Sequence, residues 1–227
     1  MAKKKLTRKE LLKKPDEFLT FSSRLFNLTV TYKYQILGGL GAVLAIVAAF
    51  TFVRFYANKT EKDGFSLLQQ NRVKYEAALQ NTDPAEAYRQ VQQDYERLME
   101  KYGTNRAGQL GKFVYADIAY RGGDNEKAIA LYQDSLDTFD DPYFKNQIFI
   151  GLGYAYEAQD RLTEALQAFE KVDPSVNAFQ KGEALYNLGR LYAALGEKDK
   201  SREFYRKIIS ENADTIYLDL VQELYGG

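Results

Sequence analysis

The sequence predicts an all-α protein in which a single N-terminal transmembrane helix is followed by an α-solenoid of paired helices. Three observations lead to this fold class. Residues 34–53 contain no charged side chain, the apolar residues of positions 57–227 recur at intervals of three and four, and two segments match each other at a spacing of 36 residues. An uncharged run of 20 residues is long enough to cross a bilayer. Spacings of three and four are the helical period, and a fixed internal spacing indicates stacked repeats.

The composition excludes several classes of enzyme. The 227 residues include no His, no Cys and no Trp. This composition excludes nucleophile systems that need His or Cys, and it excludes thiol redox chemistry. It also excludes zinc-finger sites and the common haem ligations. The many carboxylates fall on helix faces predicted to be solvated. We therefore predict no catalytic, cofactor-binding or metal-binding residue, no small-molecule substrate, and a protein that is not an enzyme.

The charges divide the chain into three parts. Residues 1–33 hold nine Lys/Arg and three Asp/Glu, a net charge of +6, whereas the remainder carries a net charge of −6. The predicted organisation is a basic arm at 1–33, a transmembrane helix at 34–56 and a repeat domain at 57–227. Nucleic-acid binding is not expected, because phosphate contacts need clustered Lys and Arg, which the acidic repeat domain lacks.

The uncharged segment runs from Tyr34 to Val53, between Lys33 and Arg54. As a helix it is about 30 Å long, which matches the hydrocarbon thickness of a bilayer. The core helix of a soluble domain rarely has 20 uncharged residues, and the run exceeds the hydrophobic region of a cleavable signal peptide. The segment is therefore predicted to be an uncleaved membrane anchor.

The flanking charges predict the orientation of this anchor. Nine Lys/Arg precede it, and only Arg54, Lys59 and Lys62 lie in the first ten residues beyond it. The positive-inside rule places the N-terminus in the cytoplasm and exports residues 57–227. In a bacterium this describes a single-pass inner-membrane protein with a periplasmic C-terminal domain.

Small residues are spaced four apart within the anchor, in the pairs Gly38/Ala42 and Gly41/Ala45. This spacing permits close packing against another membrane helix. Small residues are also common in membrane helices that have no such partner, so both interpretations stay open.

Apolar and polar residues alternate in the segment before the anchor, residues 16–32. One interpretation is an interfacial helix on the cytoplasmic leaflet, attracted to anionic lipid by the upstream lysines. The other is a disordered basic tail that only enforces the topology.

The internal repeat is clearest when Gly153 is aligned with Gly189. Both copies have Leu before this Gly and Tyr three residues after it. The further equivalent pairs are Ala165/Ser201, Phe169/Tyr205 and Val172/Ile208. A third copy lies upstream, with Ala116, Ala119, Ala128 and Tyr132 in the corresponding places. A degenerate pair is predicted from Phe65 to Leu79 and from Pro84 to Tyr102, and a capping helix at 215–224.

This pattern resembles the tetratricopeptide repeat, which has Leu-Gly-x-x-Tyr on its first helix and a small residue four before an aromatic one on its second. The resemblance implies three to four helical pairs plus the capping helix. The turns within pairs are expected at Gly122-Gly123, Gln159-Asp160 and Gly196-Glu197. One pair cannot bury its own apolar face, so the pairs stack. Small residues at the aligned positions let the two helices approach, and the aromatic residues fill the remaining space.

Stacked pairs of this kind present a groove lined by the first helix of each pair. The aromatic and charged side chains predicted to face it suit the binding of a polypeptide segment, because flat rings provide contact area at little entropic cost. The predicted protein-binding residues are Phe113, Asp117, Tyr120, Arg121, Gln147, Ile150, Tyr154, Glu157, Glu183, Tyr186 and Arg190.

The order of parts from about Tyr32 to Ile208 resembles the bacterial ancillary subunit of the Sec translocon, a membrane-anchored periplasmic tetratricopeptide protein. The stretch MEKYGTNRAGQLGKFVYADIAYRGGDNEKAIALY is most similar to that family. The resemblance implies a chaperone-like scaffold whose partners are translocon subunits, a periplasmic chaperone of the prolyl-isomerase type and exported polypeptides. The alternative is a structural adaptor in envelope assembly, cell division or another secretion complex.

Overall fold

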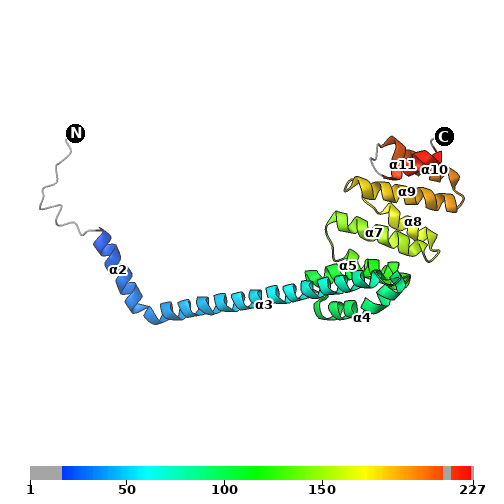
Figure 1. The fold of residues 1–227 in the computed structure, drawn as a ribbon. Coiled ribbons are helices and arrows are strands. Elements are labelled where there is room, and N and C mark those ends of the chain that lie inside the picture. Colours follow the sequence, from blue (N-terminus) through cyan, green and yellow to red (C-terminus); the bar gives the residue numbers. More distant parts are fainter. Residues whose placement is uncertain (1–16, 212–215, 226–227) are drawn as a thin grey trace, which may run out of the picture. The chain divides into compact units, whose positions relative to one another are not determined.

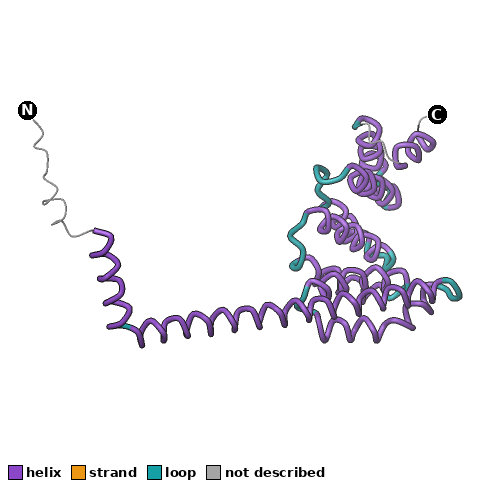
Figure 2. The backbone as a smooth tube through the Cα atoms, turned by 60° about the vertical axis from the view of Figure 1, so that its left-hand side comes forward, coloured by secondary structure: helices purple, strands orange, loops and turns teal. Residues whose placement is uncertain are grey.

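The computed structural model describes residues 17–211 and 216–225, which contain ten helices and no strand (Figures 1 and 2). The helices are α2 (Glu17–Thr31), α3 (Lys33–Leu79), α4 (Pro84–Tyr102), α5 (Arg106–Arg121), α6 (Asn125–Leu136), α7 (Pro142–Glu157), α8 (Leu162–Glu170), α9 (Ala178–Ala194), α10 (Lys198–Ser210) and α11 (Ile216–Tyr225). The all-α prediction is therefore confirmed. Residues 1–16 of the predicted basic arm, which include the lysines from Lys3 to Lys14, lie outside the described residues.

The chain forms two compact units, residues 1–58 and residues 59–227. In the first unit every side chain from position 21 to position 58 is exposed. The most apolar 18-residue window of α3 has a mean hydropathy of 2.4 and no buried residue. A core helix of a soluble protein would instead be mostly buried. By length and composition, α3 is apolar enough to cross a membrane.

Helix α3 runs without interruption from Lys33 to Leu79, so it contains both the predicted span and the predicted first helix of the degenerate pair. No proline occurs between these two segments, and the glycine between them, Gly64, does not break the helix. The boundary between the two units falls inside α3, between Asn58 and Lys59. The helix ends at Leu79, as the sequence predicted.

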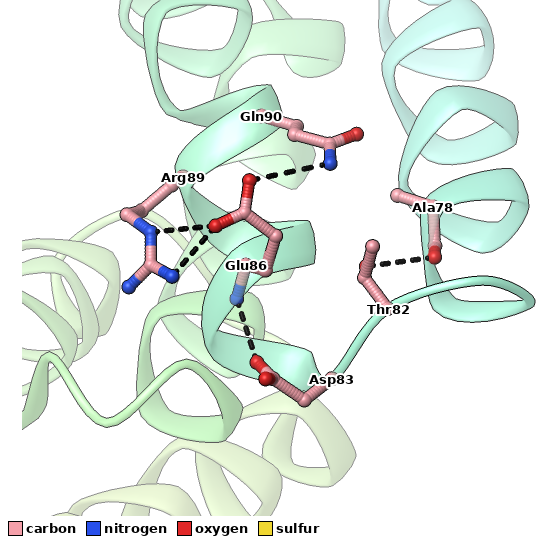
Figure 3. A network of polar contacts seen from close by, with 6 residues as sticks. All are labelled: Ala78, Thr82, Asp83, Glu86, Arg89 and Gln90. Carbon is pink, nitrogen blue, oxygen red and sulfur yellow. Dashed lines mark hydrogen bonds and ion pairs between the residues drawn. The ribbon is translucent and has the colours of Figure 1, made fainter.

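The turn after α3 is held by polar contacts within a few residues (Figure 3). The Thr82 hydroxyl donates a 2.8 Å hydrogen bond to the carbonyl oxygen of Ala78 in the last turn of α3. Asp83 then caps α4, because its carboxylate accepts a 2.8 Å bond from the backbone N–H of Glu86. Pro84 occupies the first helical position, where its missing N–H costs nothing.

The second unit consists of helical pairs that follow one another along the chain. The pairs are α5 with α6, α7 with α8, and α9 with α10, and α11 follows the last pair. The C-terminal part of α3 pairs with α4, because the two share one core and Lys74 of α3 forms an ion pair with Asp94 of α4. Figure 1 shows α5, α7 and α9 as successive layers of this unit. Within the described residues there are thus four pairs and a terminal helix, the upper end of the predicted range.

The turns of the last three pairs have the same backbone conformation. Gly123, Asp160 and Gly196 have φ angles of +83°, +57° and +80°, the left-handed region that glycine adopts most easily. The next residue in each turn donates its N–H to a carbonyl five residues back, over 2.9–3.0 Å. These bonds satisfy carbonyl groups at the end of the preceding helix. The predicted turn positions are therefore confirmed.

Close helix approach at the aligned glycines is also confirmed. A Cβ atom on Gly153 would lie 2.5 Å from Cζ of Phe169, and one on Gly189 would lie 2.6 Å from Cε1 of Tyr205. Neither distance leaves room for a methyl group unless the ring moves. The small residues of the second helices are buried as well: Ala128, Ala165 and Ser201.

The third and fourth pairs are joined by a buried amide network. Asn146 donates to the carbonyl oxygen of Asp173 over 2.9 Å and to Oε1 of Gln180 over 3.1 Å, and its own side-chain oxygen accepts a 2.8 Å bond from the N–H of Asp173. Gln180 in turn donates to the carbonyl oxygen of Tyr143. Because the side chains of Asn146 and Gln180 are buried, their hydrogen bonds fix how α9 and its preceding loop sit on α7.

Helix α11 lies within one residue of the predicted capping helix, whose first residue, Thr215, is outside the described residues. Val221 is fully buried against Tyr205 and Ile208 of α10. Asp219 and Glu223 are exposed, as predicted.

Candidate functional site

The second unit contains a cavity of about 850 Å³ that is bordered by four of its helices, α3, α5, α7 and α9, and by one residue of α6. We call it the groove. Eight of the eleven predicted binding residues line it: Phe113, Asp117, Tyr120, Arg121, Gln147, Ile150, Tyr154 and Glu183. The structure thus brings most of the predicted positions together at one place.

The floor of the groove is apolar and belongs to the core. Ile150 and Tyr132 both line the groove and are buried. Phe113 packs edge-on against Tyr132, Phe139 and Phe144, with ring centroids 6.1–6.2 Å apart. These side chains hold the floor rigidly and leave part of the Phe113 ring accessible.

One wall of the groove comes from α3, which the sequence did not predict. Arg72, Tyr75, Glu76 and Leu79 lie in the last two turns of that helix and line the cavity. The repeat alignment did not predict these residues, because the degenerate first pair lacks the Gly and Tyr by which the other repeats were aligned. The one available signal was the helical spacing of its buried residues, Leu68, Tyr75 and Ala78.

The α3 wall carries a buried hydroxyl, and two charged side chains of α5 act on it. Tyr75 is 7% exposed, and its hydroxyl has no hydrogen-bond partner among the described residues. Burial raises the pKa of this hydroxyl, and Arg121 and Asp117 are the charged groups that influence it. Asp117 and Arg121 pair across one helical turn at 2.8 Å, and both remain largely accessible.

The three tyrosines among the predicted binding residues do not all line the groove. Tyr120 and Tyr154 stack in the groove, with ring centroids 6.3 Å apart. Tyr186 does not line the groove and instead packs against Tyr205 and Tyr217, at 6.1 and 5.5 Å. The described part of α11, which carries Tyr217, therefore packs on the Tyr186 ring.

Two polar side chains of α9 form hydrogen bonds with Tyr154. The Tyr154 hydroxyl donates a 2.8 Å bond to Oε1 of Glu183 and accepts a 2.9 Å bond from Nδ2 of Asn187. Burial, followed by the adjacent Glu183 carboxylate, raises the pKa of Tyr154. Burial also raises the pKa of Glu183, and the Tyr154 hydroxyl bond opposes that shift. The hydroxyl is thus an internal support rather than a free ligand-binding group.

The remaining two predicted residues pair with each other. Arg190 Nη2 contacts Glu157 Oε2 at 2.6 Å, and Arg190 Nη1 also contacts Glu157 Oε1. The same guanidinium donates to Oδ1 of Asn187 over 2.8 Å. The pair joins α7 to α9, and both residues lie outside the groove lining.

The four predicted packing residues of the anchor, Gly38, Gly41, Ala42 and Ala45, are all exposed on α3. A Cβ atom added at Gly38 or Gly41 would meet nothing within 4 Å among the described residues. The structure describes this surface as open, and specific packing against a second membrane helix stays a prediction.

Residues 31–223 match the family described as the tetratricopeptide repeat-like domain. The chain belongs to this family. A comparison with curated proteins finds no match. Domains of this family are typically non-catalytic modules for protein interaction, which implies protein partners for this chain. The matched region includes the groove and all of α3.

Proposed function

We propose that this protein is a membrane-anchored scaffold whose groove binds segments of exported polypeptides beside the Sec translocon of a bacterial inner membrane. The observation that carries the binding proposal is the groove itself, with an apolar floor, stacked tyrosines and accessible charges of both signs. Such a surface gives contact area from its rings and orientation from its charges.

The position of the scaffold is argued from the N-terminal unit. The exposed apolar segment of α3 needs a nonpolar environment, and a bilayer provides one over the required length. The excess of Lys and Arg before it supports an N-terminus in the cytoplasm and a periplasmic repeat domain. The translocon assignment is supported by the resemblance of the sequence to the ancillary subunit family.

Site-specific photocrosslinking in living cells tests this proposal. One probe replaces Gln147 in the groove and a second replaces Leu44 in the apolar segment, while a control probe replaces Arg202, which is exposed on α10. We expect exported polypeptides at position 147, translocon subunits at position 44, and neither at position 202. Adducts confined to proteins of envelope assembly or cell division would replace the translocon role with the adaptor alternative.

The groove itself is tested by a matched pair of tyrosine variants. Tyr120→Ala removes a partly buried ring that stacks in the groove, and Tyr192→Ala removes a partly buried ring that stacks on Phe204 at 5.5 Å outside it. We expect Tyr120→Ala to weaken the adducts at position 147 and Tyr192→Ala to preserve them. Equal adducts in both folded variants would contradict binding through the groove.

A further inference from the structure

Helix α2 is amphipathic and has no role in the groove. At 100° per residue, Phe21, Leu25 and Leu28 lie in one row along its surface. Arg24, Asn27 and Thr31 lie together on a different arc, which contains no large apolar side chain. The helix therefore presents an apolar face and a separate polar face.

The apolar face is uncovered over the part of α2 whose side chains are described. Within this row, Phe21 is 66% exposed and Leu25 and Leu28 are more than half exposed. Phe26 and Val30 are also more than half exposed, but at 100° per residue they lie about 140–180° from Phe21 and so outside the row. A series of large exposed apolar side chains on one short helix is costly in water and marks a contact surface.

The polar face carries a cation that has no carboxylate partner among the described side chains. This cation is Arg24, and Asn27 and Thr31 lie one turn and two turns further along the same arc. Residues 1–33 have a net charge of +6. A segment with this net positive charge is attracted to an anionic surface.

The chain connection places α2 at the end of the apolar segment. Helix α2 ends at Thr31 and α3 begins at Lys33. Hydrogen bonds continue through the joint, from the Tyr32 N–H to the Leu28 carbonyl and from the Ile36 N–H to the Tyr32 carbonyl, each over 2.9 Å. Because residues 34–53 already have the length of a full span, α2 is not needed inside the bilayer and begins where the span ends.

We infer that α2 is an interfacial helix that lies on the membrane surface next to its own anchor and binds anionic lipid. The row Phe21, Leu25 and Leu28 contacts the acyl chains, while Arg24, Asn27 and Thr31 face the headgroups. A helix of this kind sits with its apolar face about 5–10 Å into the boundary between headgroups and chains. This inference rests on the proposed function, in which α3 spans the membrane. It adds a second membrane contact, which the anchoring of the repeat domain does not require.

Spin labels test the inference, because the chain contains no cysteine and single labels are easily introduced. The full-length protein is labelled at each position from 21 to 31 and reconstituted in vesicles of phosphatidylcholine with phosphatidylglycerol. Collision with oxygen reports exposure to lipid, and collision with a water-soluble nickel chelate reports exposure to water. Leu28→Cys and Asn27→Cys form the matched pair, since they are adjacent in sequence and lie on different faces.

We expect the oxygen-to-nickel ratio to oscillate with the helical period, high at positions 21, 25 and 28 and low at 24, 27 and 31. The amplitude is expected to fall in vesicles of phosphatidylcholine alone and at high salt. A flat profile with high nickel exposure would show a solvated tail and overturn the inference. Low exposure to both reagents at positions 21, 25 and 28 would show that protein covers α2, which also overturns it, and an equal amplitude in both lipids would overturn the binding of anionic lipid.

A label at Leu44 separates failure of this inference from failure of the anchor. High oxygen exposure at position 44 together with a flat profile in α2 would overturn only the interfacial helix. High nickel exposure at position 44 would overturn the span on which the proposed function and this inference both depend.

Discussion

The apolar segment of α3 and the repeat domain use glycine in opposite ways. Among the described residues, a Cβ atom at Gly38, Gly39 or Gly41 would meet nothing within 4 Å, whereas one at Gly153 or Gly189 would lie 2.5–2.6 Å from a buried ring. In the repeats, glycine lets one helix lie directly against an aromatic side chain of its partner. In the apolar segment, the same residue leaves a smooth helix surface that this chain does not cover within its described residues.

The aromatic residues show the same contrast. Phe169 is 1% exposed and lies against Gly153, whereas Phe50 in the apolar segment is 64% exposed. The difference teaches that the apolar residues of the two regions face different surroundings. Those of the repeats are buried by the fold itself, and those of α3 before residue 59 must be covered by lipid or by another molecule.

The largest expected effect comes from removing the ring that fills the space beside Gly153. We expect Phe169→Ala to lower the free energy of unfolding of the repeat domain by about 3–5 kcal/mol, because it deletes a fully buried ring and leaves a cavity. Thermal and denaturant unfolding in detergent, followed by circular dichroism, measures this loss.

Phe50→Ala is the matched control, since it removes the same ring from an exposed position. It is expected to leave the unfolding of the repeats unchanged. A similar loss in both variants would show that the two regions do not differ in the way the comparison states.

The second effect tests the glycine side of the same contact. Gly153→Ala places a methyl group into the Phe169 ring, and overpacking of this kind costs about 1–3 kcal/mol. The better helix propensity of alanine offsets roughly 0.5–1 kcal/mol of that cost. We therefore expect a net destabilisation in the same unfolding measurement, and none for Gly41→Ala. A more stable Gly153→Ala variant would contradict the tight approach of α7 and α8.

A smaller loss of stability is expected when the Tyr154 hydroxyl in the groove is removed. Tyr154→Phe keeps the stack on Tyr120 but removes the bonds to Glu183 and Asn187, for a loss of about 1 kcal/mol. Tyr34→Phe removes an exposed hydroxyl before the apolar segment and serves as the control. Equal stability of the wild type and Tyr154→Phe would show that these two hydrogen bonds contribute nothing to the stability of the fold.

The smallest effect concerns the pH dependence of the groove. Burial raises the pKa of Glu183 in the folded protein, so the folded state binds more protons than the unfolded state between the ordinary carboxyl pKa and the raised one. The contribution of Glu183 to stability is therefore full below its ordinary pKa and is lost as the pH rises through the raised value. We expect Glu183→Gln to gain stability relative to the wild type as the pH rises through this range. Parallel stability curves for the two proteins would contradict a raised pKa at this site.

Much of the fold was predictable because it depends on short-range patterns. The in-phase Gly and aromatic positions, such as Gly153 with Phe169 and Gly189 with Tyr205, identified which residues touch within one pair. The turn at Asp160 was placed correctly although its left-handed residue is not glycine, because the repeat spacing located it. Contacts within one repeat recur at fixed sequence separations, so the sequence alone reveals them.

The groove was only partly predictable, because its borders depend on how successive pairs rotate and on how α11 packs after the last pair. Tyr186 was expected in the groove and packs against Tyr217, and Glu157 pairs with Arg190 outside the lining. The α3 wall with Tyr75 was not foreseen, because its pair lacks the repeat residues. These contacts join positions about 30 or more residues apart whose phases differ from pair to pair.

The sequence by itself determined the helical class, the repeat phase, the turns and the long apolar segment. Each of these depends on the order of neighbouring residues along the chain and on the helical period. Only the tertiary structure decided which side chains border the groove, which polar groups are already paired, and that α3 continues from the apolar segment into the first repeat. These features depend on which surfaces meet after the helices have formed, and packing between distant residues determines that.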